Sequence, residues 1–243
     1  MKGIRLKAYQ SVANYKVKSS FQLRESYPLP QYSTIIGMIH DLCGFKGYHE
    51  MDISVQGNYA SRTNDLTTRY EVTNDTYNDR YPLFYINDCK EKKGIQKGVS
   101  MTNLLVDVNL IIHIVPKNEE EIQTIYEALD NPRYYPSLGR WEDLLRIDEV
   151  KIVDIDKNEF DEEFNLEYDA YIPLKYIDGV NSLATRYKID KNYKIVGKNR
   201  KFNQIDVIHA KANDEILEDT SVNVDEDGYV VFLAWQIIIK MIL

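Results

Sequence analysis

The four histidines are the first residues of this 243-residue chain that could take part in catalysis. A ribonuclease that works without a metal ion needs a base for the 2′-hydroxyl of RNA and an acid for the leaving 5′-oxygen. His40, inside the first predicted helix, and Tyr32, just before its predicted start, form the only such pairing near that helix. A histidine in a helix or strand is more often a packing residue with hydrogen bonds. An endoribonuclease is therefore one alternative that the sequence leaves open.

A second set of side chains has the chemistry of binding rather than catalysis. Arg62, Arg69 and Arg80 alternate with tyrosines that include Tyr70, and a basic run ends at Lys97. Cationic side chains pair with phosphates, while flat rings stack on unpaired bases. The pattern predicts contacts with single-stranded RNA, and ordinary solvated charges on a hairpin are the alternative interpretation.

Hydroxyl, cationic and aromatic groups elsewhere extend this predicted RNA-binding set. Ser33 and Thr34, at the start of the first predicted helix, present hydroxyls and free backbone N–H groups to an anion, or simply cap the helix. Arg140 offers a two-pronged donor to phosphate. Trp141 beside it can stack on a base or pack in the interior. The set is completed by two residues that precede the first helix, Lys18 and Arg24.

Several other function classes lack their sequence signatures. There is no glycine-rich nucleotide loop of the kind that an ATPase or dehydrogenase needs, and we expect no cofactor and no metal. Cys43 and Cys89 have no metal-binding or redox spacing, so we expect free thiols in a reducing cytoplasm. No apolar run approaches the ~18 residues of a transmembrane helix, so we expect no membrane partner.

Charge is divided unevenly along the chain, whose net charge is −8. Residues 1–115 carry a net charge of +3 and residues 116–243 a net charge of −11. An RNA surface is therefore expected mainly in the first half. Residues 170–215 are a local exception, with nine basic and five acidic side chains.

The first helix is predicted from a proline-rich entry and an apolar stripe. Pro28 and Pro30 hold the chain extended, and Ser33 is the predicted N-cap. Apolar residues then recur at helical spacing, which predicts one buried face. Gly37 interrupts the helix and is expected to let another backbone approach. Gly44 is expected to end it.

The remaining elements complete the order β-α-β-β-α-β. A second helix is predicted over residues 122–129, behind a capping box made by Asn118 and Glu121. Gly57 is a possible bulge in the second strand. The order is that of a ferredoxin-like α+β fold, with two helices on one face of an antiparallel sheet. Strands are predicted at residues 4–9, 53–59, 104–115 and 147–155.

The connection between the second and third strands is unusually long. Residues 60–103 stand where a few hairpin residues would suffice. Their aromatic residues and strand-like pieces at 67–73 and 81–87 predict a protruding β-hairpin arm. We therefore expect a ferredoxin-like domain at residues 1–156 with the arm at about 60–103, followed by a small β-rich extension at 157–243. The apolar end, residues 230–243, is either a core strand with a packed tail or a tail that docks on a neighbour.

Two motifs carry a family resemblance. The segments PLPQYSTIIGMIHDLCGF, from Pro28, and SLGRWEDLLRIDEV, from Ser137, resemble those of the Cas-five proteins. These are RAMP-type subunits with an RRM-like ferredoxin fold that cap the guide RNA in type I CRISPR Cascade complexes. The resemblance is closest to subtype I-B and spans most of residues 1–155.

The resemblance implies a non-catalytic ribonucleoprotein subunit in antiviral defence. It would bind the 5′ handle of a CRISPR guide RNA, with the arm as a thumb that kinks the RNA. Its partners would be the Cascade backbone subunit and the large subunit, with target DNA met only through the complex. In subtype I-C the corresponding protein cuts precursor RNA, which keeps the endoribonuclease alternative open. A protein-interaction module with incidental RNA contact is the other alternative.

Overall fold

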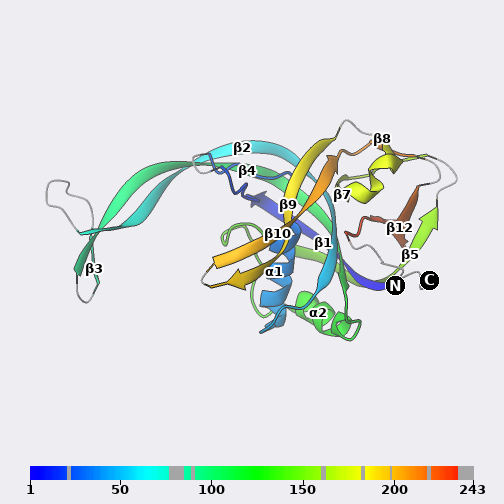
Figure 1. The fold of residues 1–243 in the computed structure, drawn as a ribbon, viewed down its shortest axis with the longest axis horizontal. Coiled ribbons are helices and arrows are strands. Elements are labelled where there is room, and N and C mark those ends of the chain that lie inside the picture. Colours follow the sequence, from blue (N-terminus) through cyan, green and yellow to red (C-terminus); the bar gives the residue numbers. More distant parts are fainter. Residues whose placement is uncertain are drawn as a thin grey trace.

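The computed structural model describes residues 1–20, 23–76, 85–88, 91–159, 163–181, 184–197, 199–217 and 220–234. Its main feature is a large antiparallel sheet of ten strands with few helices (Figure 1). The strand order is β13-β12-β5-β1-β4-β2-β7-β10-β9, and β3 pairs with β4. The α-helices are α1 (Tyr32–Cys43) and α2 (Glu121–Asp130), and η1 (Leu174–Gly179) is a 3-10 helix. The strands are β1 (Lys2–Ala13), β2 (Met51–Thr76), β3 (Tyr85–Asp88), β4 (Glu91–Pro116), β5 (Arg146–Glu159), β6 (Phe164–Asn165), β7 (Asp169–Pro173), β8 (Val180–Asn181), β9 (Thr185–Val196), β10 (Asn199–Ala210), β11 (Glu215–Ile216), β12 (Ser221–Asp225) and β13 (Val230–Val231).

Alternating apolar residues place the main core on one face of the sheet. Ile4, Leu6 and Ala8 of β1 are buried, and Ile4 pairs with Ile114 of β4. Successive strand residues point to opposite faces, so these residues share one side. The helices α1 and α2 contact each other and pack on this side (Figure 1). The predicted strands and both predicted helices are therefore present, and β4 ends at Pro116 as expected.

The start of α1 differs from the prediction, whereas its end agrees. The N-cap is Gln31 rather than Ser33, and no side chain caps the helix. The Gln31 side chain is engaged elsewhere, because its Oε1 accepts a hydrogen bond of 2.9 Å from the backbone N–H of Asp190. Gly44 ends the helix in the left-handed region, with φ 68°, which glycine adopts without a Cβ clash.

Two glycines have roles other than the predicted ones. Within the described part of the chain, no atom outside the helix itself lies within 4 Å of the position that a Cβ on Gly37 would take, so no backbone approaches the helix there. Gly57 is not a bulge, because its pairing with Leu110 belongs to an unbroken stretch of the β2–β4 register. A Cβ on Gly57 would lie 2.3 Å from the carbonyl oxygen of Asn109. The close approach that the sequence suggested for Gly37 thus occurs at Gly57.

The predicted capping box before α2 does not form. The N-cap is Glu120, without a side-chain cap, and Glu121 is the first helical residue. Asn118 Oδ1 instead accepts from the backbone N–H of Glu120 at 3.2 Å. The Glu121 carboxylate lies 2.9 Å from Nδ1 of His49, in the segment after α1. Glu121 therefore ties α2 to the α1–β2 connection rather than to its own cap.

On the opposite face of the sheet, β1, β4 and β5 contact the strap, which we define as residues 221–234. The strap includes β12, which pairs with the end of β5, and β13. Its apolar residues Val231 and Leu233 pack on β4 and β5. A buried ionic cluster fixes its turn, because Arg5 of β1 binds Asp225 and Asp227 at 2.6 Å each. His113 of β4 donates to Asp225 at 3.1 Å, and burial lowers the pKa of this histidine, which keeps it neutral.

The distal parts of β2 and β4 form a two-stranded ribbon that leaves the body of the molecule (Figure 1). We call residues 60–76 and 91–103 the arm. The pairing continues from Ile53↔Ile114 in the body to Tyr70↔Lys97 in the arm. The sheet strands thus run into the arm without a break, and residues 67–73 belong to β2 itself. Residues 81–84 of the second predicted piece lie outside the described part, and β3 follows them.

Strands from the C-terminal half extend both edges of the sheet. β7, β10 and β9 lie beyond β2, and β12 and β13 lie beyond β5. A separate three-stranded sheet has the order β6-β11-β8. Of the apolar end, Val231, Phe232 and Leu233 are buried, and residues 235–243 lie outside the described part. None of the described helices has the length and apolar character needed to cross a bilayer.

Candidate RNA-binding surface

The base of the arm exposes a cation held against an aromatic ring. Arg62 Nε donates to the hydroxyl of Tyr59 at 3.2 Å, and its guanidinium carbon lies 5.1 Å from the ring centroid. Neither contact neutralises the charge. Within the part of the chain that the structure describes, Arg62 has no carboxylate partner. Arg62 therefore presents a full positive charge to solvent, as an RNA phosphate contact requires.

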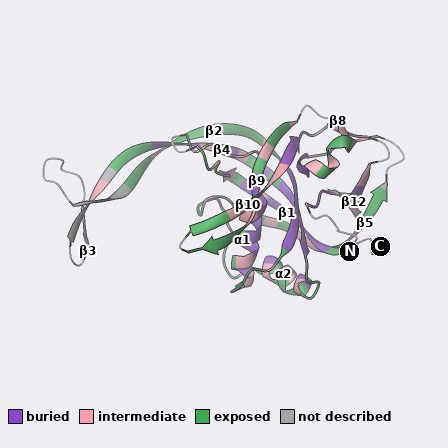
Figure 2. Cartoon of the chain, in the orientation of Figure 1, coloured by how far each residue is buried: buried purple, intermediate pink, exposed green. Residues whose placement is uncertain are grey.

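Farther out, much of the described arm is exposed (Figure 2), and its exposed side chains include apolar ones. Leu66 is paired with Met101, and Leu66 is 66% exposed. Val99 on the same face is 74% exposed. Paired residues point to one side of an antiparallel ribbon, so these residues form a continuous apolar stripe. A two-stranded ribbon cannot bury such a stripe by itself, so its geometry suits contact with another molecule.

The other arm residues predicted to bind RNA are placed as follows. Tyr70 and Lys97 are directly paired and exposed, and Tyr70 is 58% exposed. Arg69, the neighbour of Tyr70, is also exposed. The structure therefore places one ring and one cation, Tyr70 and Lys97, on the same face near the end of the described ribbon, whereas Arg69 points to the opposite face. Arg80 lies outside the described residues.

The helix start offers less to an anion than the sequence suggested. The backbone N–H of Thr34 donates to the carbonyl of Gln31 at 3.0 Å. It is therefore not free for an anion. Ser33 and Thr34 are both half-buried, and Ser33 lies inside the first turn rather than at the cap.

The predicted phosphate fork of Arg140 is engaged within the chain. Its Nη2 donates to Asp143 at 2.7 Å, and its Nη1 lies 2.9 Å from Glu142. Asp143 is fully buried and also accepts from the backbone N–H of Asn14. Arg140 thus stabilises its own loop, and a phosphate would have to displace a buried carboxylate. Trp141, by contrast, is 87% exposed and remains accessible for stacking.

Lys18 and Arg24 lie in the segment between β1 and α1. The Lys18 ammonium pairs with Asp190 and lies 3.1 Å from the ring centroid of Phe202. Lys18 is therefore attached to the hairpin of β9 and β10. Arg24 is half-buried with φ 41°, and its carbonyl accepts 2.8 Å from the Asn14 side chain. These two predicted residues are therefore held by different parts of the molecule.

The predicted catalytic pair is not assembled. His40 Nδ1 lies 2.8 Å from the carbonyl of Ile36, and its Nε2 accepts from the backbone N–H of His49 at 3.0 Å. Both ring nitrogens are occupied, and burial lowers the His40 pKa. Tyr32 is fully buried, and burial raises its pKa. Among the described residues no cluster of His, Cys, Asp or Glu could hold a metal ion.

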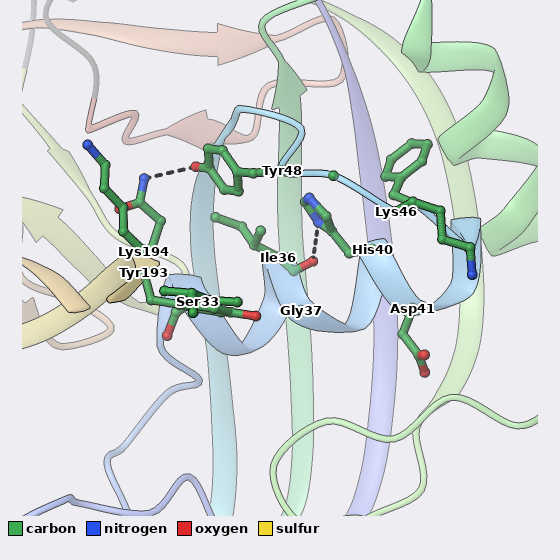
Figure 3. Close-up of a pocket in the computed structure, with 14 residues that line it drawn as sticks. Ser33, Ile36, Gly37, His40, Asp41, Lys46, Tyr48, Tyr193 and Lys194 are labelled. Atoms are coloured by element: carbon green, nitrogen blue, oxygen red, sulfur yellow. Dashed lines mark hydrogen bonds between the residues drawn. The ribbon is translucent and has the colours of Figure 1, made fainter. Parts of the chain in front are cut away.

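A groove of about 740 Å³ lies between α1 and β9, and the predicted site residues Ser33 and His40 are among the residues that line it (Figure 3). Its floor is the exposed side of α1 around Gly37, and β9 supplies Tyr193 and Lys194. The segment after α1 supplies Lys46 and Tyr48. Asn192 of β9 donates a hydrogen bond of 2.8 Å to the Tyr48 hydroxyl, which is drawn as a dashed line at Tyr48 in Figure 3. The groove combines rings, cations and a small floor residue.

Comparison with protein families identifies the chain. A family model described as CRISPR-associated protein (Cas_Cas5) matches residues 3–194. The chain belongs to this Cas_Cas5 family. A comparison with curated proteins finds no match.

Solved structures show a similar fold for this Cas_Cas5 protein. A chain described as a CRISPR RNA-guided surveillance complex is 17% identical, with a TM-score of 0.56 over 87% of this chain and 91% of that chain. A CRISPR protein from Archaeoglobus fulgidus is 13% identical, with a TM-score of 0.45 over 97% of this chain and 100% of its own. The first likeness shows a shared fold, which in this chain is a large antiparallel sheet with few helices.

The groove of this Cas_Cas5 protein was not predicted from the sequence, although Ser33 and His40, which line it, were predicted as site residues for other reasons. The available signal was the segment 185–201, which holds seven Lys or Arg residues and one Asp, together with Tyr187 and Tyr193. The sequence placed this basic segment in a C-terminal extension. It could not show that β9 contacts α1, so the two halves of the groove stayed separate.

Proposed function

We propose that this Cas_Cas5 protein is a non-catalytic subunit of a type I CRISPR Cascade complex that binds and caps the 5′ handle of the guide RNA. Family membership and the fold shared with a chain of an RNA-guided surveillance complex support this proposal. The occupied ring nitrogens of His40 support the non-catalytic part, because a general base needs a free nitrogen.

We further propose that residues 1–156 form a ferredoxin-like domain. The central strand order β5-β1-β4-β2, with α1 after β1 and α2 after β4, supports it. The arm then corresponds to an insertion at about residues 60–103 that lengthens β2 and β4. Residues 157–243 form the β-rich extension, which adds strands to both sheet edges.

The observation that carries the RNA proposal is the exposed, cation-bearing arm. Arg62 keeps its charge against Tyr59, and Tyr70 lies beside Lys97. A narrow ribbon with rings and cations can enter between nucleotides, where bases stack and phosphates pair. The apolar stripe of Leu66, Val99 and Met101 would face the Cascade backbone subunit or the large subunit.

Electrophoretic binding to handle RNA tests the arm. Changing Arg62, Arg69 and Arg80 together to Ala should weaken binding and lower the slope of log K against log salt by about 2, since each lost single-strand phosphate contact removes about 0.7. The matched control changes three lysines at the other end of the sheet, Lys2, Lys117 and Lys157, which should leave the slope unchanged. Equal slopes for both triple variants would count against the arm. Failure of the assembled complex to hold handle RNA would count against the function.

A further inference from the structure

The floor of the groove beside α1 contains a residue without a side chain, Gly37. Gly37 is exposed in the middle of the helix, and nothing approaches the site of a Cβ there. A glycine inside a helix lowers helix stability by about 1 kcal/mol relative to alanine, so a glycine at this position is expected to have a structural or functional role. No packing reason exists among the described residues. The open space instead belongs to a groove whose volume is in the usual range for ligand sites.

Two tyrosines flank this floor from different elements. Tyr48 is 52% exposed and Tyr193 is 36% exposed. The Tyr48 ring lies nearly parallel to the His40 ring, at 15° and 5.8 Å between centroids. Its hydroxyl is fixed by Asn192. Tyr48 is therefore held in one orientation before any ligand arrives, which lowers the entropy cost of stacking.

Cations are concentrated at the groove and on its β9–β10 wall. Lys194 and Lys46 lie toward opposite ends of the floor (Figure 3). Within the described part of the chain, neither has a carboxylate partner, nor do Lys188, Arg200 or Lys201 on the hairpin. The other two described hairpin cations are neutralised, since Arg186 pairs with Asp206 and Lys191 with Asp52.

Asp41 is the acidic side chain among the lining residues, and it is outnumbered by the two lysines, Lys46 and Lys194. Asp41 accepts a hydrogen bond of 2.6 Å from the hydroxyl of Tyr134. The lining therefore favours an anion with a flat apolar part over an acidic peptide or a neutral helix.

We propose that this groove binds one unpaired nucleotide of RNA, with the base against Tyr48 and Tyr193 and the flanking phosphates at Lys46 and Lys194. The proposal rests on the RNA-binding function proposed above and adds a second contact point to it, on the body rather than on the arm. A strand crossing the groove would meet a cation at each end and rings between them. Gly37 leaves the floor low enough for a base.

An abasic scan of the handle RNA tests the groove with the full-length chain. Each nucleotide in turn loses its base, and the affinity is measured for the wild type and for the variant with Tyr48→Ala and Tyr193→Ala. In the wild type, one abasic position should weaken binding by about 5- to 150-fold, the usual worth of one stacked base. In the double variant the same position should have no further effect. Tyr135→Ala, an 84% exposed tyrosine outside the groove, is the matched control and should preserve the effect.

A charge variant covers the case in which the tyrosine variant does not fold. Lys46→Gln with Lys194→Gln should lower the salt slope by about 1.4. If RNA binds and depends on the arm, but no abasic position couples to the tyrosines and the salt slope is unchanged, the groove proposal is overturned and the arm function stands. If the wild type binds no RNA, both are overturned. If the groove variants bind RNA normally but no longer co-purify with other Cascade subunits, the groove is a protein-docking surface and the nucleotide proposal is overturned.

Discussion

Two aspartates of the strap allow a direct test of how burial changes the contribution of an ion pair to protein stability. Asp225 and Asp227 each lie 2.6 Å from the Arg5 guanidinium. The Asp225 side chain is 0% exposed, whereas that of Asp227 is 40% exposed. The distance is the same, so only the surroundings differ. Asp225 also accepts from His113 and from the backbone N–H groups of Asp227 and Tyr229.

The expected cost follows from these contacts. Asp225→Ala removes the one fully buried carboxylate partner of Arg5, which keeps only the half-exposed Asp227 and Glu149. It also leaves the buried His113 ring and two backbone N–H groups without their acceptor, so the free energy of unfolding should fall by about 3–5 kcal/mol in all. Asp227→Ala removes a half-exposed partner, with an expected loss of about 1 kcal/mol or less. With a urea m value of about 3 kcal/mol/M, the midpoints should fall by about 1–1.7 M and about 0.3 M or less. Urea unfolding followed by circular dichroism measures both.

The pH dependence of the same pair adds a second reading. Burial would raise the pKa of Asp225, but the hydrogen bonds from His113, Tyr229 and Arg5 outweigh it and lower the pKa. A carboxylate with a lowered folded pKa stabilises the protein fully above its unfolded pKa of about 3.9 and loses that contribution as the pH falls. The gap between wild type and Asp225→Ala should therefore shrink below about pH 4. If both variants lowered the urea midpoint by the same amount at pH 7, the conclusion that the buried Asp225 holds the strap more strongly than Asp227 would be wrong.

Four further outcomes are expected. Gly57→Ala should destabilise the protein by about 1–3 kcal/mol because the added Cβ would meet the Asn109 carbonyl. Gly98→Ala is the control, since its added Cβ would enter open space, and it should be neutral or slightly stabilising. Thermal unfolding of both variants measures the difference. Gly37→Ala should raise helix stability by up to about 1 kcal/mol, while Gly44→Ala, at φ 68°, should lower it; a decrease for Gly37→Ala would show an unseen neighbour. Burial would raise the pKa of Asp169, but the hydrogen bonds from His209, Lys211 and the N–H of Ala212 outweigh it and lower the pKa to about 2. Asp169→Asn should therefore lower the free energy of unfolding by about 2 kcal/mol above pH 4, and this difference from wild type should vanish toward pH 2. Unfolding measured along an acid titration tests this. Repeat RNA incubated with the protein in EDTA should stay intact on a denaturing gel, and site-specific cuts that disappear in His40→Ala would contradict the non-catalytic assignment.

The elements whose signals are local could be predicted from the sequence. Ile4, Leu6 and Ala8 show the period of two that β1 has in the fold. Gly44 ends α1 in the conformation that glycine favours, and Pro116 ends β4. These features depend on residues a few positions apart, so the chain itself carries enough information.

The features that depend on distant partners could not be predicted in this way. Gln31 replaces Ser33 at the helix start, and its side chain is used by Asp190, 159 residues away. Gly57 meets a carbonyl on a neighbouring strand. The groove requires α1 and β9 to be neighbours, which no local pattern states. Arg140 is different, because its partner Asp143 is three residues away and belonged to the motif already noted. The ion pair with Asp143 could therefore have been predicted from the sequence in place of a phosphate contact for Arg140.

β2 and β4 keep one register from the body into the arm, although Ala60 and Asp107 do not pair at its base, and this constant register limits how the arm's length can change. Removing one residue from β2 between Arg62 and Tyr70 would turn every later side chain to the opposite side of the ribbon, because strand side chains alternate. Only paired deletions of two residues per strand would shorten the reach, by about 7 Å, while keeping the same groups toward the same neighbour. Related arms that still work should therefore differ in length by even steps, with single insertions confined to the tip.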